Sequence, residues 1–166
     1  SSRRRHTRYI SVTGVQTCAL PISLPVLKQA GIRFARRGGS PEVSYKEGGG
    51  VAYEPGLDHP LLIPTAGDAR PDWTLDHLKR AVAMAREGRI AVLQFHGVPD
   101  GEHPWVNTPR ERFEEYMAWL HREGFKVIAL RDLARYIDEQ IVPANPLEIM
   151  EGRKRAISAQ PPKPAP

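Results

Sequence analysis

The feature of this sequence that most constrains its fold is an amphipathic segment followed directly by an apolar run. Apolar residues recur at helical spacing from Leu75 to Ala85, Gly88 follows them, and RIAVLQF (89–95) is almost continuously hydrophobic. A run of this kind is typical of a parallel strand that is buried on both faces. The sequence therefore predicts a helix over 75–85 that leads into a central strand.

The same order recurs immediately afterwards. The stretch from Thr108 to Glu111 has the pattern of a capping box with proline at the first helical position, and apolar residues then repeat on one face up to Gly124. FKVIAL (125–130) predicts a short strand, and RDLARYID (131–138) predicts a further helix. This alternation predicts an α/β fold, a parallel sheet or barrel in which helices cover the strands.

The chain before this alternation has weaker patterns. Residues 32–35 have the composition of a strand, whereas residues 38–71 are rich in glycine and proline and predict a long loop with a small hairpin. A closed barrel of this class takes about 250 residues, and we expect roughly 110 to be ordered here. We therefore interpret the chain as a partial (β/α) barrel that is truncated at its N-terminus.

The two ends differ from the middle in composition. Residues 1–22 hold four basic and no acidic residues, lack a sustained period and resemble translated sequencing-adapter read-through. We interpret them as non-native, and a disordered basic arm is the alternative. Residues 139–166 combine prolines with a basic GRKR cluster and predict a flexible tail. Residues 23–138 are therefore expected to form the folded domain.

The positive charge of the chain lies mostly in these ends. The formal net charge is +5, from 24 basic and 19 acidic residues; eight basic residues and one acidic residue lie in 1–22 and 151–166, which leaves 16 and 18 between them. A nearly neutral middle gives no electrostatic indication of a nucleic-acid partner. Cys18 is the single cysteine, which excludes an intrachain disulfide. No segment reaches the roughly 20 apolar residues that cross a bilayer, so no membrane partner is indicated.

Candidate chemistry follows the strand predicted over 89–95. In parallel α/β folds the reacting groups gather beyond the carboxyl ends of the strands, and His96 occupies that position. A histidine there can act as a general acid, and the alternative is a structural histidine that holds the following loop. Asp100 and His103 in that loop are expected to be solvated. The spacing of His96 and His103 is not that of a dedicated metal site.

Three motifs favour the catalytic interpretation of His96. GIRFARRGG (31–39), DARPDW (68–73) and AVLQFHG (91–97) follow one another along the chain. In order and spacing they resemble the arginine, Asp-Trp and leucine-histidine motifs of the polysaccharide deacetylases, also called the NodB-homology or carbohydrate esterase family 4 group. Residues 112–133 are similar to the closing helix and strand of that family, so that the resemblance covers Gly31 to Asp138.

This resemblance implies a fold and a reaction. The family fold is a distorted (β/α) barrel, and a divalent metal, zinc or a similar ion, polarises an acetyl group and activates water. His96 corresponds to the general acid that protonates the departing sugar nitrogen or oxygen. Arg33 corresponds to the arginine that orients the catalytic base, with Arg36 as the second candidate, and Asp72 corresponds to the residue that holds that arginine or the histidine. A solvated arginine pair and a helix-capping aspartate are the ordinary alternatives.

The remaining site residues follow the family pattern less closely. Trp73 corresponds to a wall of the substrate pocket, and core packing is its alternative. The family usually has leucine two residues before the histidine and a small acid after it, but Gln94 and Gly97 stand there. Leu93 is then the candidate for the pocket that receives the acetyl methyl group.

The leading hypothesis is a fragment of a metal-dependent deacetylase that hydrolyses amide or ester bonds in acetylated polysaccharide or oligosaccharide. The family's Asp-Asp and His-x-x-x-His motifs, which hold base and metal, have no counterpart in the chain. We therefore expect this chain to be inactive and to bind no metal specifically. The alternatives are a non-catalytic carbohydrate-binding relative, in which Trp73 and Trp105 stack on sugar rings, and a small α/β interaction domain without a substrate.

Overall fold

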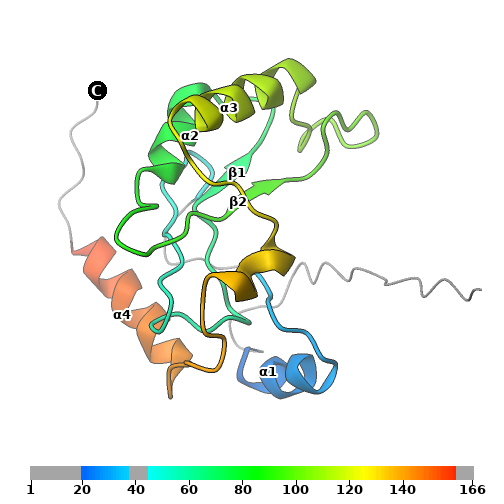
Figure 1. Cartoon of the computed structure of the whole chain (residues 1–166). Coiled ribbons are helices and arrows are strands. Elements are labelled where there is room, and N and C mark those ends of the chain that lie inside the picture. Colours follow the sequence, from blue (N-terminus) through cyan, green and yellow to red (C-terminus); the bar gives the residue numbers. More distant parts are fainter. Residues whose placement is uncertain (1–19, 38–44, 160–166) are drawn as a thin grey trace, which may run out of the picture.

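A computed structural model describes residues 20–37 and 45–159 of the chain. Most of the segment expected to be non-native, residues 1–22, and the end of the expected tail lie outside the described residues. At the centre is a two-stranded parallel sheet, formed by β1 (Gly67–Ala69) and β2 (Leu93–Phe95), in which Gly67 pairs with Leu93 and Ala69 with Phe95. The structure is thus a small α/β fold (Figure 1).

The helix predicted over 75–85 connects the two strands, as a parallel pair requires. It is α2 (Leu75–Val82), and it ends earlier than its apolar stripe predicts. Thr74 begins it with a capping box, because the Thr74 hydroxyl accepts the His77 amide while the His77 ring accepts the Thr74 amide. The chain then reverses at Gly88, whose φ of +79° suits glycine.

Helix α3 (Arg110–Arg122) packs beside α2 on one face of the sheet (Figure 1). The helix was predicted, but the capping box at its start is wrong, because the Thr108 hydroxyl donates to the Ala69 carbonyl at 3.2 Å instead. Between the helices and the sheet lies an apolar core. Its buried members are Ala66, Ala69, Trp73, Leu78, Ala81, Val82, Tyr116 and Leu120.

The opposite face of the sheet is covered by a short 3-10 helix, η2 (Leu130–Arg135), where RDLARYID predicted a helix. Leu133 of η2 forms a second core with Tyr53 and Ile63, and each of these residues is at most 1% exposed. Val92, the residue before β2, packs on this second cluster, whereas Leu93 and Phe95 of β2 pack on the α2 and α3 side.

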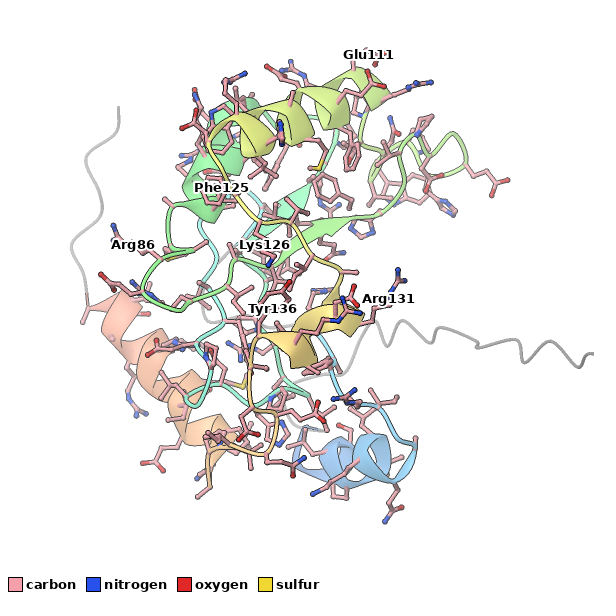
Figure 2. The ribbon with its side chains drawn as sticks, in the orientation of Figure 1. Arg86, Glu111, Phe125, Lys126, Arg131 and Tyr136 are labelled. Carbon is pink, nitrogen blue, oxygen red and sulfur yellow. The ribbon has the colours of Figure 1, made fainter. Side chains whose placement is uncertain are left out.

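The strand predicted over 125–130 is absent from the described residues, and this prediction is wrong. The segment passes from α3 to η2: Phe125 packs against the α2 and α3 side, Ile128 packs against the η2 side, and Val127 is 63% exposed. Lys126 lies over the Tyr136 ring, with its ammonium 4.7 Å from the ring centre (Figure 2). Side-chain packing on two different clusters thus holds this segment in place, without hydrogen bonds to a neighbouring strand among the described residues.

The long loop predicted over 38–71 is also partly wrong, since it contains β1 and a buried run. Residues 60–69 are buried throughout, and Ile63 forms a parallel bridge with Arg36 beside the segment predicted as a strand over 32–35. In the described part of this loop, residues 45–71, Tyr53 pairs antiparallel with the distant Ile90 and no local hairpin is formed. The strand predicted over 89–95 is shorter in the structure. It is reduced to β2, and the three residues of β2 are half-buried.

The remaining helices lie at the end of the molecule away from α2 and α3 (Figure 1). They are α1 (Leu20–Gln29) and α4 (Pro146–Ser158). The prediction of a flexible tail is wrong for residues 146–158. Asn145 caps α4 by accepting the Glu148 amide at 3.3 Å, and Met150 is buried against Leu62. None of the helices in the described residues is long and apolar enough to span a membrane.

Candidate active site

The carboxyl ends of β1 and β2 bring polar side chains together on one face of the sheet. Gly67 and Leu93 pack toward α2 and α3, as Ala69 and Phe95 do two residues later. Because side chains alternate along a strand, Asp68 and Gln94 face the opposite way, and His96 joins them just beyond β2. This is the edge at which the sequence predicted chemistry.

A buried carboxylate connects the two strands there. His96 Nε2 lies 3.0 Å from Asp68 Oδ1, and the Asp68 side chain is 1% exposed. The other oxygen, Asp68 Oδ2, accepts a hydrogen bond from Arg70 Nε at 2.9 Å and forms an ion pair with Arg70 Nη2 at 2.9 Å. Both carboxylate oxygens therefore have charge-assisted or ionisable donors, as a buried carboxylate requires.

The bond to Asp68 determines which nitrogen of His96 is available for chemistry. A carboxylate can only accept, so the bond requires a hydrogen on His96 Nε2. The second ring nitrogen, Nδ1, then holds the lone pair of the neutral ring and the exchangeable proton of the charged ring. The His96 side chain is 28% exposed, while Asp68 beneath it is buried. The arrangement can give a proton to, or take one from, a molecule at the surface.

Gln94 competes with Asp68 for the same nitrogen. Its amide nitrogen lies 2.7 Å from His96 Nε2, and its amide oxygen is buried without a hydrogen-bond partner in the described structure. The Gln94 amide can donate only to an Nε2 without hydrogen, whereas Asp68 needs that hydrogen. Because the bond to a carboxylate is the stronger of the two, the neutral ring carries its hydrogen on Nε2.

Two of the predicted residues lie outside this arrangement. Arg33 is exposed and forms an ion pair with Glu139, with Nη2 2.8 Å from Oε1. Arg36 donates from Nη1 to the Thr65 hydroxyl at 2.8 Å, ahead of the amino end of β1. Neither arginine contacts His96 in the described structure.

The other predicted residues are also separated from His96. Asp72 is exposed and makes no hydrogen bond to His96; the aspartate of the DARPDW motif that does so is Asp68. Trp73 is 2% exposed, donates from its indole nitrogen to the Lys46 carbonyl, and packs in the helix-side core. Leu93 packs on that same side, opposite to His96. Trp73 and Leu93 therefore present no surface to a ligand bound at His96.

Sequence reasoning missed Asp68 and Arg70. The available signal was the position of the motif's two aspartates, since Asp68 lies three residues before Pro71 and within a strand, whereas Asp72 follows the proline. Deciding between Asp68 and Asp72 required knowing that residues 67–69 pair with 93–95. That pairing is a long-range contact which local sequence patterns do not specify.

The loop after His96 is held by its own polar groups. Asp100 Oδ1 accepts the amides of Glu102 and His103, and the Asp100 amide donates to Asn107 at 2.7 Å. Although desolvation raises it, the pKa of the Asp100 carboxyl is lowered overall by hydrogen bonds from the amide and the ring of His103. These contacts explain the loop structurally without a ligand.

The residues at this site do not fit a catalytic metal. His96 and Asp68 offer at most two ligands, and the Asp68 carboxylate is already neutralised by Arg70. Within the described ranges, no group of three or more His, Cys, Asp or Glu residues is arranged to hold a metal ion. Divalent zinc takes at least three protein ligands in its catalytic sites. We therefore derive no step through a metal from these residues.

Comparisons with known proteins add no assignment. No family model matches the chain, and searches of curated proteins and of solved structures find no match. The interpretation of the site rests on its own geometry and on the motif resemblance.

Proposed function

We propose that this chain is the C-terminal part of a polysaccharide deacetylase-type hydrolase, a partial (β/α) barrel in which His96 is the general acid. The observation that carries the proposal is the Arg70, Asp68 and His96 series at the carboxyl ends of two parallel strands. It supplies a histidine that is oriented from behind by a buried carboxylate and accessible from the front. Such an arrangement is what general acid catalysis needs.

His96, Asp68 and Arg70 are assigned to the step in which the sugar leaves the acetyl group. When the bond between the acetyl carbon and the sugar nitrogen or oxygen breaks, its electron pair goes to the leaving atom. The proton on His96 Nδ1 passes to that atom, and the ring returns to its neutral form with hydrogen on Nε2. Asp68 stabilises the charged ring before the transfer, and Arg70 holds Asp68 in position. The substrate is an acetylated polysaccharide or oligosaccharide.

The proposal assigns the base and the metal ligands to a region that precedes this chain in the parent protein. Long-read sequencing of the parent locus tests this directly. We expect an upstream reading frame that contains a strand ending in paired aspartates and a loop with His-x-x-x-His. A start codon close to Ser23, with no such motifs before it, would overturn the proposal that the chain is a fragment.

Activity of the extended protein tests the role of His96. Expressed with zinc, it is expected to release acetate from N-acetylated chitooligosaccharide, and His96→Ala to lower kcat by about 10²-fold or more. The matched control is His103→Ala in the exposed loop, which should leave kcat within about twofold. Equal rates for the wild type and the His96 variant would remove His96 from the reaction. The chain alone is expected to release no acetate.

A binding function without catalysis has one specific observation in its favour. Trp105 is 64% exposed in the loop that follows His96, with its ring edge-on to His103 at 5.4 Å between centres. An exposed indole can stack on a sugar ring, which buried Trp73 cannot. Calorimetric titration of the chain with chitotetraose separates the alternatives: saturable binding that Trp105→Ala abolishes favours the binding function for this chain.

A further inference from the structure

A pocket lies at the end of the molecule away from His96, where three separate segments meet. It has a volume of about 480 Å³, within the range of about 300–1,000 Å³ that is usual for small-molecule sites. One wall is α1, a second is the segment 59–62, and a third is the start of α4. None of Asp68, Arg70, Gln94 or His96 lines it, so it has no part in the function proposed above.

Most of the pocket lining is apolar and belongs to a packed cluster. Leu62 is 2% exposed and packs with Met150, and Leu24 and Leu147 pack against both. Leu62, Leu24 and Leu147 also line the pocket, together with Pro25, Leu61, Ala144 and Pro146. The lining of the pocket is therefore mostly apolar and held by core contacts, suited to an apolar body rather than to a sugar.

The three polar side chains that line the pocket each offer a hydrogen-bond donor or a positive charge. His59 Nδ1 accepts the Leu61 amide at 3.0 Å, which places the hydrogen of the neutral ring on Nε2. The Asn145 oxygen is taken up by the Glu148 amide, which leaves the Asn145 amide nitrogen as a donor. Lys28 adds a positive charge. No acidic side chain is among the described residues that line the pocket.

The positive charge of Lys28 also affects His59, the other ionisable residue that lines the pocket. Burial and then the charge of Lys28 lower the pKa of His59. The neighbouring carboxylate, Asp58, does not balance this charge, because Arg153 binds both of its oxygens at 2.7 and 3.0 Å. An anion placed at the mouth of the pocket would therefore meet a cation and hydrogen-bond donors without an internal competitor.

We propose that this pocket binds a small monocarboxylate with an unbranched or aromatic apolar body, with its carboxylate at Lys28 and His59 and its body against Leu24, Leu62 and Leu147. The apolar walls select the body, and the cation with two donors selects the anion. A charge-assisted bond between Lys28 and the carboxylate contributes a specificity that an alcohol of equal length lacks.

Calorimetric titration of the chain with octanoate, 1-octanol and octylammonium tests this proposal. We expect saturable octanoate binding, at least tenfold weaker binding of octanol, and no binding of octylammonium. Equal affinity for octanoate and octanol would overturn the carboxylate assignment, and absence of saturable octanoate binding would overturn the site. Because this comparison uses the unaltered chain, it does not depend on how any variant folds.

Two variants locate the binding. Lys28→Met keeps the side-chain stem and is expected to weaken octanoate by about tenfold while leaving octanol unchanged; the control is Lys154→Met on exposed α4. Ala144→Phe fills the pocket from an exposed position and is expected to abolish both. Octanoate binding that neither variant changes would place the ligand elsewhere and overturn the proposal. Urea unfolding checks that each variant retains the fold.

Discussion

Two buried aspartates, Asp58 and Asp68, have the same exposure and different partners. Each side chain is 1% exposed and each is bound by arginine. Asp58 has both oxygens bound by Arg153 and a further contact of 3.7 Å with Arg37. Asp68 gives one oxygen to Arg70 and the other to His96. The side-chain partners of Asp58 are arginines, which stay charged at any physiological pH, whereas the partners of Asp68 include a histidine.

This difference separates a structural ion pair from a candidate catalytic one. Asp58 and Arg153 are 95 residues apart in sequence, and their bidentate contact fastens α4 to the loop before β1. Asp68 binds partners on its own and the neighbouring strand, and the histidine on its far side is partly exposed. Burial of a carboxylate with arginine therefore indicates no function by itself. The informative feature is a titratable partner that faces solvent.

The largest expected effect comes from a substitution that removes the ion pair between Asp58 and Arg153. Arg153→Met leaves the Asp58 carboxylate buried with Arg37 at 3.7 Å as its closest remaining cation, and should lower the free energy of unfolding by about 3 kcal/mol. Urea denaturation followed by tryptophan fluorescence measures this change. Arg155→Met, on the exposed side of the same helix, is the control and should change it by less than about 0.5 kcal/mol. A loss below about 1 kcal/mol for Arg153→Met would show that α4 is held by its apolar contacts instead.

The second-largest expected effect is a loss of stability at alkaline pH that involves Tyr53, whose pKa is affected by Asp58. Burial, and then the charge of Asp58, raises the pKa of Tyr53 to about 12 from its usual value of 10.0. The folded state thus keeps the phenol proton more tightly than the unfolded state. Stability from this group is complete below pH 10 and is lost between about pH 10 and 12, by roughly 2–3 kcal/mol in total.

Tyr53→Phe tests this assignment, because phenylalanine has no proton to lose. The variant should keep its stability over that interval relative to the wild type, measured by urea unfolding at several alkaline pH values. Tyr136→Phe changes an exposed ring and should retain the wild-type loss. If both variants lose stability as the wild type does, another group causes the alkaline transition.

The two clusters also show how far sequence patterns extend. Periodicity predicted α2 and α3, and Gly124, with a φ of +75°, ends the second where expected. His96 lies at a strand end, as its position after an apolar run predicted. These are local properties, in which a few neighbouring residues determine the outcome.

Features that depend on long-range contacts were missed. Helix α4 was taken for tail because of its prolines, although Pro146 after Asn145 is a favourable start for a helix; its burial depends on Leu62 and Asp58, which are distant in sequence. The segment 125–129 has the composition of a strand, but no neighbouring strand pairs with it among the described residues.

The smallest expected effect on stability comes from Asp68→Asn, which tests whether Asp68 sets the tautomer of His96. Asp68→Asn keeps the shape of the side chain and one acceptor, so stability should fall by only about 1 kcal/mol, since Arg70 is one-third exposed. The tautomer of His96 should respond more clearly. Without the carboxylate, the Gln94 amide at 2.7 Å can donate to Nε2, and the ring hydrogen moves in part to Nδ1.

Nitrogen-15 chemical shifts of the neutral form of the His96 ring report this change directly. The wild type should show hydrogen on Nε2, and Asp68→Asn should give a mixture of both tautomers. Asp58→Asn, which removes the equally buried carboxylate of the other cluster, should leave the His96 signals unchanged, because its partners are arginines. A wild type that already carries its hydrogen on Nδ1 would mean that Gln94, rather than Asp68, sets the tautomer, and the working nitrogen of His96 would then be the one that faces the protein.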